Sequence, residues 1–264
     1  MIHYFIPYRR RGLLWQMVKR EVQQKFLGSW LGLSWALITP LAMLSVYTFV
    51  FRSVLNAKWP GASDSNVEFA LQIFSGLLVY GLFSEIIGRA PNLIVEQPNL
   101  VKKVIFPLEI LPWVSTLSAL FFSSVSFLVL LAGLLIMRDG LTIHVLSVPL
   151  IAAVFVPMLL GLSWLLASLG VYLRDINHVV SLLLAPMLFL SPIFYPTSAL
   201  PEFAQSIMQF NPLTVIIESF RGATLGAQWP NFQVLGNYFV VSIIMAISGA
   251  ACFKKIRTGF ADVL

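Results

Sequence analysis

"VPLIAAVFVPMLLGLSWLLASLGVYLRDI" (residues 148–176) is the stretch of sequence that decides the fold. It carries no charged side chain before Arg174 and Asp175, and an apolar helix of about 20 residues is long enough to cross a bilayer. The whole chain has the same character, because 58% of its residues are hydrophobic and only 11% are charged. An ordinary soluble domain is about a quarter charged, so the composition predicts an integral membrane protein.

The chain contains several other apolar runs of comparable length. They do not alternate apolar and polar residues as the strands of a membrane barrel do, so the predicted fold class is an all-α integral membrane protein. We expect one transmembrane domain over residues 1–264, with a cytoplasmic N-terminus (1–30), a six-span bundle (31–253) and a cytoplasmic tail (254–264). The six expected crossings have bounds near 31–51, 69–88, 111–137, 148–171, 178–195 and 233–253.

The distribution of lysine and arginine predicts the orientation in the membrane. Short loops rich in these residues stay on the cytoplasmic side. With both termini inside, thirteen of the 17 lysines and arginines are cytoplasmic, and four are outside: Arg52, Lys58, Arg138 and Arg221. The formal charge of +6 therefore follows from topology, and the basic residues lack the soluble, aromatic-interleaved surface of a nucleic-acid-binding protein.

Residues 13–26, "LLWQMVKREVQQKF", have the spacing of an amphipathic helix. Leu14, Val18, Val22 and Phe26 recur every four residues, and charged and amide side chains occupy the other side. Such a helix can lie in the headgroup plane with its apolar face towards the hydrocarbon. A plain juxtamembrane anchor fits the same pattern equally well.

The segment between the second and third expected spans, "RAPNLIVEQPNLVKKVIFPLEILP" (89–112), is punctuated by four prolines. A continuous helix is therefore not expected, and Asn92 and Asn99 are predicted to cap two short helices. An ordinary positive-inside loop is the alternative, but a simple connector needs neither paired caps nor an apolar ridge. The polar residues of this segment form its expected exposed face: Glu96, Gln97, Asn99, Lys102 and Lys103.

The junction of the fourth and fifth expected spans holds two adjacent charges, Arg174 and Asp175. They lie close to the predicted cytoplasmic face, where a charge costs less than at the bilayer centre. A local pair at a helix end is the simplest interpretation.

The apolar segment 203–225 is too interrupted to form another crossing. Six spans with both termini inside place it on the outer side of the membrane. Helices that enter the membrane and return are tolerated where their backbone is buried in protein or lines a wet cavity. We therefore expect a re-entrant hairpin before the last span, with helices near 202–209 and 212–224.

The second of these helices lies in "NPLTVIIESFRGATLG" (211–226). Asn211 is predicted to cap it, with Pro212 as its first residue and a glycine at its end. Glu218 and Arg221 are three residues apart, so they share one face and can pair. Charges in such apolar surroundings indicate a functional or gating role by default. A pair that only orients the hairpin is the alternative, and residue chemistry alone favours it.

Signatures of catalysis and of metal binding are missing from the sequence. It has no G-x-x-x-x-G-K-[ST] nucleotide loop, no H-E-x-x-H, no G-x-S-x-G and no aspartate cluster suited to a diphosphate with Mg²⁺. Cys252 is the only cysteine, so neither an internal disulfide nor a thiolate metal site can form. We expect no catalysis by this chain alone and no cofactor bound to it.

Four motifs in order resemble one known family. They are "GSWLGLSWALITPL" (28–41), "NLVKKVIFPLEILP" (99–112), "LRDI" (173–176) and "NPLTVIIESFRGATLG" (211–226). Together they resemble the permease subunit of ABC-2 type polysaccharide exporters, which move O-antigen, capsular polysaccharide or wall teichoic acid. The resemblance covers essentially the whole chain, and none of the motifs separates the three substrates.

The resemblance implies a set of partners in the bacterial cytoplasmic membrane. Two permease copies would pair with two copies of a cytosolic ATPase, which carries the ATP and Mg²⁺. An undecaprenyl-diphosphate-linked polysaccharide would pass between the permeases. The 89–112 segment would act as a coupling helix seated on the ATPase, Arg174 and Asp175 would lie near it, and the hairpin with Asn211, Pro212, Glu218 and Arg221 would gate the outer mouth.

A pore for a sugar polymer should be wide, wet and lined in part by aromatic rings. The chain is 13% aromatic, although most of these residues are expected in interface belts or in packing. The candidates for the glycan channel are Trp30, Trp35, Phe194 and Tyr195.

Three other functions remain open. An ABC-2 exporter of lipid or drug shares the fold and the partners. A membrane enzyme acting on polyprenyl-linked sugars would need carboxylate clusters in its loops, and an ion channel or ion-coupled carrier would need ionisable residues in mid-span. The sequence shows neither feature.

Overall fold

The computed structural model describes residues 10–25, 31–54, 59, 66–101, 106–137 and 140–263. Every element in these ranges is an α-helix or a short 3₁₀ or π turn, and no strand occurs among them. The predicted all-α class is confirmed.

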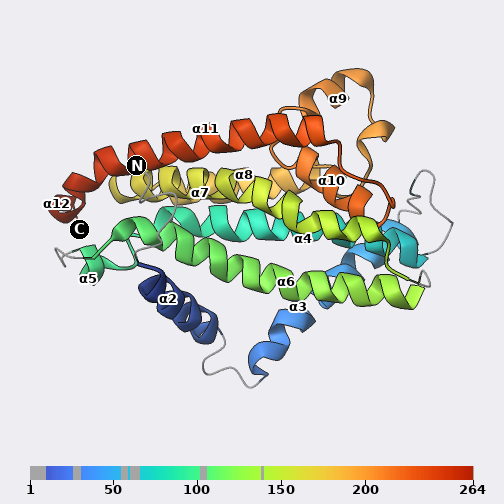
Figure 1. Ribbon diagram of the computed structural model, residues 1–264, viewed down its shortest axis with the longest axis horizontal. Helices are drawn as coiled ribbons and strands as arrows, with labels where there is room; N and C mark the ends of the chain where they lie inside the picture. The colour runs from blue at the N-terminus through green and yellow to red at the C-terminus, as the bar shows by residue number, and fades with distance from the viewer. Residues whose placement is uncertain are drawn as a thin grey trace.

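Four long helices run side by side along the molecule (Figure 1). They are α4 (Asn66–Arg89), α6 (Leu111–Met137), α7 (Val148–Tyr172) and α11 (Phe232–Ile256). Each is long and apolar enough to cross a membrane, and they correspond to four of the six expected crossings. The chain is therefore a multi-pass membrane protein.

The other two expected crossings contain shorter helices. Helix α3 (Trp35–Thr48) has 14 residues and continues into the π turn η3 (Phe49–Val54), and α8 (Ile176–Leu190) has 15. Helix α8 rises only about 23 Å, against a hydrocarbon core of about 30 Å, and α3 reaches the length of a span only together with its π turn. The six-span topology therefore stays a prediction.

The expected fifth span, 178–195, was wrong at its end. Helix α8 stops at Leu190, and Ser191 adopts an extended conformation with φ −98° and ψ 152°. The cause is local, because the residue before a proline is pushed out of the helical region, and Pro192 follows directly.

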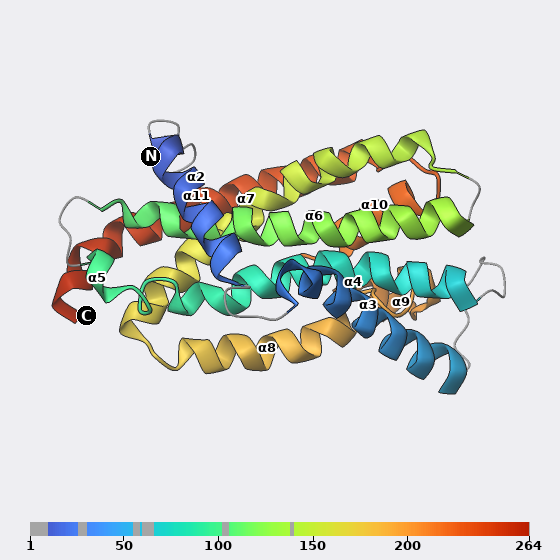
Figure 2. The same cartoon turned by 90° about the horizontal axis from the view of Figure 1, so that it is seen from below.

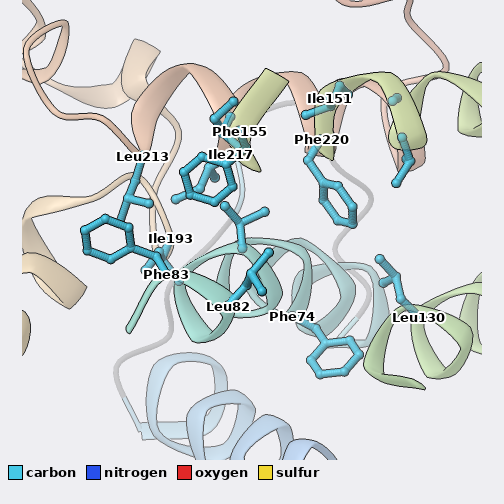
Figure 3. Close-up of a cluster of buried hydrophobic side chains, with 14 of the residues drawn as sticks. Phe74, Leu82, Phe83, Leu130, Ile151, Phe155, Ile193, Leu213, Ile217 and Phe220 are labelled. Atoms are coloured by element: carbon cyan, nitrogen blue, oxygen red, sulfur yellow. The ribbon is translucent and has the colours of Figure 1, made fainter. Parts of the chain in front are cut away.

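Helix α4 lies at the centre of the hydrophobic core. Its buried side chains Phe74, Leu82 and Phe83 belong to one cluster with Phe155 of α7 and Phe220 of α10 (Thr214–Thr224) (Figure 3). Helix α10 is thus packed into the bundle instead of lying on its surface. Burial on this scale fixes the position of α10 relative to α4, because each fully buried large apolar side chain contributes about 1.5 to 3 kcal/mol.

The two ends of the bundle carry different small elements (Figure 1). We call one the loop end, where η4 (Ala90–Asn92), α5 (Pro98–Val101) and α12 (Phe260–Val263) lie. The other is the hairpin end, with α9 (Glu202–Met208) and α10. The remaining short turns are η2 (Gly32–Ser34), η5 (Leu108–Ile110), η6 (Ile143–Ser147), η7 (Thr197–Ala199) and η8 (Arg257–Gly259).

The amphipathic segment predicted over 13–26 forms helix α2 (Arg11–Gln24), which crosses the bundle at an angle near the loop end (Figure 2). It packs against α6, and its Val18 is buried. The apolar face expected to point into lipid thus turns, at least in part, towards the protein. Trp15, three residues before Val18, remains exposed.

Candidate functional site

Arg221 is the most unusual side chain at the hairpin end. It is only 5% exposed, and its Nη2 donates to the backbone carbonyls of Ile193 at 3.1 Å and Gln72 at 3.3 Å. Its guanidinium stacks 4.5 Å from the ring centroid of Trp59. One cation therefore links α10 to α4 at Gln72 and to the turn that follows α8.

Glu218 is the predicted partner of Arg221, and the pair is confirmed. Its carboxylate lies 3.9 Å from Arg221 Nη1 and accepts a hydrogen bond from the Thr197 backbone N–H at 3.2 Å. Within the described part of the chain, Arg221 Nε and Nη1 make no hydrogen bond. The pair is therefore loose, and the backbone carbonyls hold Arg221 more closely than the carboxylate does.

Asn211 closes the hairpin against the end of α8. Its side chain donates to the Leu190 carbonyl and to Ser191 Oγ, and its Oδ1 accepts from the Leu213 backbone N–H. This is the chemistry of a cap, but helix α10 begins at Thr214, after a turn. Pro212 is consequently not the first helical residue, and its carbonyl accepts a hydrogen bond from Tyr238 of α11.

The end of α10 differs from the predicted glycine stop. Ala227, and not a glycine, has the left-handed conformation, with φ 49°. The Gln228 N–H bonds back to the Gly222 carbonyl at 3.0 Å, one residue further along the chain than the long hydrogen bond of a Schellman ending. The sequence offered Gly222 or Gly226 as the end, because glycine adopts positive φ most easily, and Gly226 does follow the C-cap residue Leu225.

Replacing Arg221 with methionine should destabilise the hairpin end, because the variant keeps the bulk of the side chain but loses both carbonyl hydrogen bonds. We expect a loss of about 1–3 kcal/mol of stability. The measurement is thermal unfolding in detergent, combined with limited proteolysis of the segment 196–213.

The matched control for this prediction is Glu218→Gln. It removes the other charge of the pair from a side chain that is 36% exposed, so the cost should stay below about 1 kcal/mol. Equal losses for both variants would contradict the greater role given to the carbonyl contacts.

The loop end presents part of the polar face predicted from the sequence. Glu96 and Asn99 are exposed, and Gln97 is half-buried. The predicted caps were wrong, because Asn92 ends η4 and Asn99 lies inside α5. Pro91 and Pro98 occupy early positions of these turns, and proline suits the first turn of a helix. Lys102 and Lys103 lie outside the described residues.

Arg174 and Asp175 are both exposed in the turn between α7 and α8. In the ranges that the structure describes, neither side chain forms a hydrogen bond or an ion pair, and Asp175 stands at the start of α8 without a side-chain cap. The predicted local pair does not form. The two charges are instead available on the surface of the loop end.

Glu109 is a residue that sequence reasoning missed. It is 8% exposed, and its two carboxylate oxygens accept from Arg10 at 3.0 Å and from Arg257 at 2.7 Å. Its backbone carbonyl accepts from the Trp164 indole. Glu109 therefore joins the start of α2, the last turns of the chain and α7. A lone carboxylate within "FPLEILP" was the available signal.

Two further ion pairs hold α2 to α4. Arg89 Nη1 lies 2.7 Å from Glu21, and Lys25 pairs with Glu85. Together with Arg10 and Glu109, they fix both ends of the helix to the bundle. Helix α2 is therefore a docked element of the loop end.

The four aromatic candidates for the glycan channel have different surroundings. Trp35 is exposed at the start of α3, and Tyr195 is half-buried with its hydroxyl donating to the Phe189 carbonyl. Phe194 is buried and packs between Tyr47 and Phe189. Trp30 lies outside the described residues. Their role in a channel stays a prediction.

Among the described residues, no cluster of histidine, cysteine and carboxylate side chains could hold a metal ion. The arrangement offers a buried mechanical link at the hairpin end and an exposed polar surface at the loop end. In class, the chain is a multi-pass helical membrane protein with a helical hairpin packed into one end of its bundle.

Comparison with known proteins identifies the family. Residues 12–225 match the ABC-2 type transporter family, and the chain belongs to it. The chain is 29% identical over 257 residues to the O-antigen export system permease protein RfbA of Myxococcus xanthus, covering 97% of this chain and 96% of that protein. An RfbA permease of Klebsiella pneumoniae is 26% identical, with 96% and 95% covered. The polysialic acid transport protein KpsM of Escherichia coli is 23% identical, with 89% and 90% covered.

Proposed function

We propose that the chain is the channel-forming subunit of an ATP-driven exporter that moves a lipid-linked polysaccharide, with O-antigen as the substrate. The observation that carries this proposal is the full-length similarity to permeases named for O-antigen export. The order of the elements supports it, since docked α2, the loop after α4 and the hairpin before α11 each lie at an end of the bundle. Export of capsular polysaccharide is the second candidate, because the similarity to KpsM also covers most of both chains.

The energy for export comes, in this proposal, from a separate ATPase. The sequence has no nucleotide loop, so two copies of a cytosolic ABC ATPase bind the ATP and Mg²⁺. They dock at the loop end, where Glu96, Gln97, Asn99, Arg174 and Asp175 offer polar contacts and Lys102 and Lys103 add positive charge. No cofactor binds to the chain itself.

A second copy of the chain completes the channel. Helices α3 and α8 expose large apolar side chains, among them Leu37, Leu41, Leu182 and Leu183. Some of these face lipid and others the second copy, and the glycan passes between the two copies. The undecaprenyl diphosphate anchor of the substrate travels in the membrane. Trp30, Trp35, Phe194 and Tyr195 remain the aromatic candidates for contact with the sugar.

The location is the cytoplasmic membrane of a bacterium, with both termini in the cytoplasm. The loop end then faces inwards, and Arg10, Arg89, Arg174, Lys254 and Arg257 lie on that side in agreement with the positive-inside rule. The hairpin end faces outwards. There Asn211, Pro212, Glu218 and Arg221 hold the gate, with α10 as its fixed part and the more exposed α9 as its movable part.

Reversing the charge of Lys102 and Lys103 tests the docking surface. In the double variant Lys102→Glu and Lys103→Glu, the ATPase should co-purify at least about ten-fold less well, because two attractive contacts at the interface become repulsive. The measurement is the yield of the ATPase bound to the tagged permease, followed by ATP hydrolysis with and without lipid-linked glycan.

The matched control is Lys254→Glu with Lys255→Glu, which makes the same charge change at the end of α11. It should leave the ATPase bound. Unchanged yield in the Lys102 and Lys103 variant would remove the coupling role. An active chain that works without any ATPase would overturn the proposed function.

A further inference from the structure

A groove of about 550 Å³ opens between α3, α4 and α6. We call it the α3–α4 groove. Its walls are mainly apolar and include Pro40, Met43, Phe74, Leu78 and Phe122. Helix α3 runs obliquely across α4 (Figure 2), and 14 residues cannot cover the full length of its neighbour. The groove is the space left beneath it.

The length of the groove along α4 matches the thickness of one leaflet's hydrocarbon region. Along α4 its lining extends from Phe74 to Glu85, which is about 16 Å of helix. Half of a hydrocarbon core of about 30 Å is about 15 Å. With Glu85 placed at the headgroup plane of the leaflet at the loop end, the groove reaches close to the bilayer centre.

The mouth of the groove carries a cation and an anion side by side. Lys25, directly after α2, pairs with Glu85, and its Nζ lies 4.2 Å from the centroid of the Phe122 ring. The Lys25–Glu85 pair has no net charge, and neither has the neighbouring pair of Arg89 with Glu21. Lys19 and Arg20 point to other sides of α2, because they are six and five positions from Lys25, respectively, on a helix of 3.6 residues per turn. The mouth thus presents both signs of charge and no net charge.

Three of the hydroxyl groups that line this mainly apolar groove already donate hydrogen bonds to backbone carbonyls. Tyr80 donates to the Leu184 carbonyl, Ser84 to the Gly81 carbonyl and Ser126 to the Phe122 carbonyl. A sugar in the groove would bury hydroxyls with few partners, which is costly. A hydrocarbon chain meets no such penalty.

We propose that the α3–α4 groove binds one acyl chain of a zwitterionic phospholipid of the phosphatidylethanolamine type. The phosphate of its headgroup lies at Lys25, and its ammonium lies at Glu85. The lipid fills the space under α3 and ties α2 to the bundle at the level of the headgroups. Trp35, one of the aromatic candidates for contact with the sugar, also lines the groove, so the lipid site adjoins the proposed glycan path.

A second copy of the chain is the competing occupant of the groove. Helix geometry separates the two surfaces, because Leu37, Ile38 and Leu41 lie on the side of α3 opposite to Ala36, Pro40 and Tyr47. A partner can therefore cover the exposed apolar side of α3 and leave the groove open to lipid.

The test uses the full-length chain with its ATPase in nanodiscs that contain phosphatidylethanolamine with a photoreactive diazirine in one acyl chain. After illumination, mass spectrometry of the peptides should find the label on α3, α4 and α6 residues that line the groove. Gly81 lines the groove, and a side chain there would meet no atom within 4 Å. Gly81→Leu should fill the groove and reduce its labelling about ten-fold, which is ~1.4 kcal/mol of binding.

Gly236→Leu on α11 is the matched control, since a side chain there also meets nothing within 4 Å. It should leave the groove labelling unchanged. Ser123→Leu is a second filling variant from α6, and both filling variants are checked for helical content and complex yield. Groove labelling that persists in both, or that is absent from the wild-type dimer because a second copy covers it, would overturn the proposal.

The headgroup is tested with a phosphatidylglycerol carrying the same diazirine chain. It lacks an ammonium for Glu85, so its groove labelling should be several-fold weaker at equal lipid content. Equal labelling by the two lipids would overturn the assignment of the ammonium to Glu85.

Discussion

Replacing Gly249 with alanine should lower the stability of the protein by about 3 kcal/mol, the upper end of the usual cost of overpacking. A methyl group at Gly249 of α11 would lie 2.1 Å from the Gly161 carbonyl oxygen of α7, and one at Gly161 would lie 2.4 Å from the Met245 carbonyl. These neighbours are backbone atoms, so no side-chain rotation relieves the clash. The two helices must separate along their contact.

The measurement is the thermal midpoint in detergent, which should fall by roughly 6–12 °C. The control is Gly236→Ala on the same helix, where a methyl group meets nothing within 4 Å. Alanine is favoured over glycine in a helix by about 1 kcal/mol, so this variant should be slightly more stable than the parent. A lower thermal midpoint for Gly249→Ala and a higher one for Gly236→Ala would show that packing, and not helix propensity, decides the result. If both variants were stabilised, the close approach of α11 to α7 at Gly249 would be refuted.

Replacing Gly170 with alanine should uncouple the loop end from the bundle while leaving the membrane helices folded. A methyl group there would lie 2.2 Å from the Pro91 carbonyl oxygen, so η4 has to move away from α7. The exposed face that carries Glu96 and Asn99 follows η4 in the chain and moves with it. Under the proposed function, binding of the ATPase should fall about ten-fold, or ~1.4 kcal/mol.

The experiment compares ATPase co-purification with helical content by circular dichroism. Gly88→Ala is the control at the same end of the bundle, because its methyl group would make an ordinary 3.4 Å contact with a Leu184 methyl group. It should keep the ATPase bound. A Gly170→Ala variant with normal ATPase binding would show that the position of η4 on α7 does not matter for docking.

The four long crossings could be predicted from the sequence because membrane insertion depends on hydrophobicity summed over about 20 adjacent residues. The ends of the spans depend on single residues and not on the summed hydrophobicity. Helix α8, for example, ends at Leu190 because Pro192 forces Ser191 out of the helical conformation. That signal was present in the sequence and was missed. The lengths of α3 and α8 leave the count of six crossings open.

The hairpin shows where residue spacing suffices and where it fails. Glu218 and Arg221 pair because side chains three positions apart lie on the same face of a helix. The stronger contacts of Arg221 are with the carbonyls of Gln72 and Ile193, which are 149 and 28 positions away in the chain. No local pattern reveals them, and they decide that α10 is the anchored half of the hairpin.

The sequence by itself determined a helical membrane protein, the approximate spans and the family motifs, because hydrophobicity and helical periodicity are properties of neighbouring residues. The tertiary structure decided the burial of Arg221, the ion pairs of Glu109 with Arg10 and Arg257, the docking of α2 and the groove beneath α3. Each of these depends on which distant segments meet, and that is fixed by packing at points such as Gly161 with Gly249 and Gly170 with Pro91. A glycine looks the same in the sequence whether it faces open space or another backbone, so only the folded chain distinguishes the two.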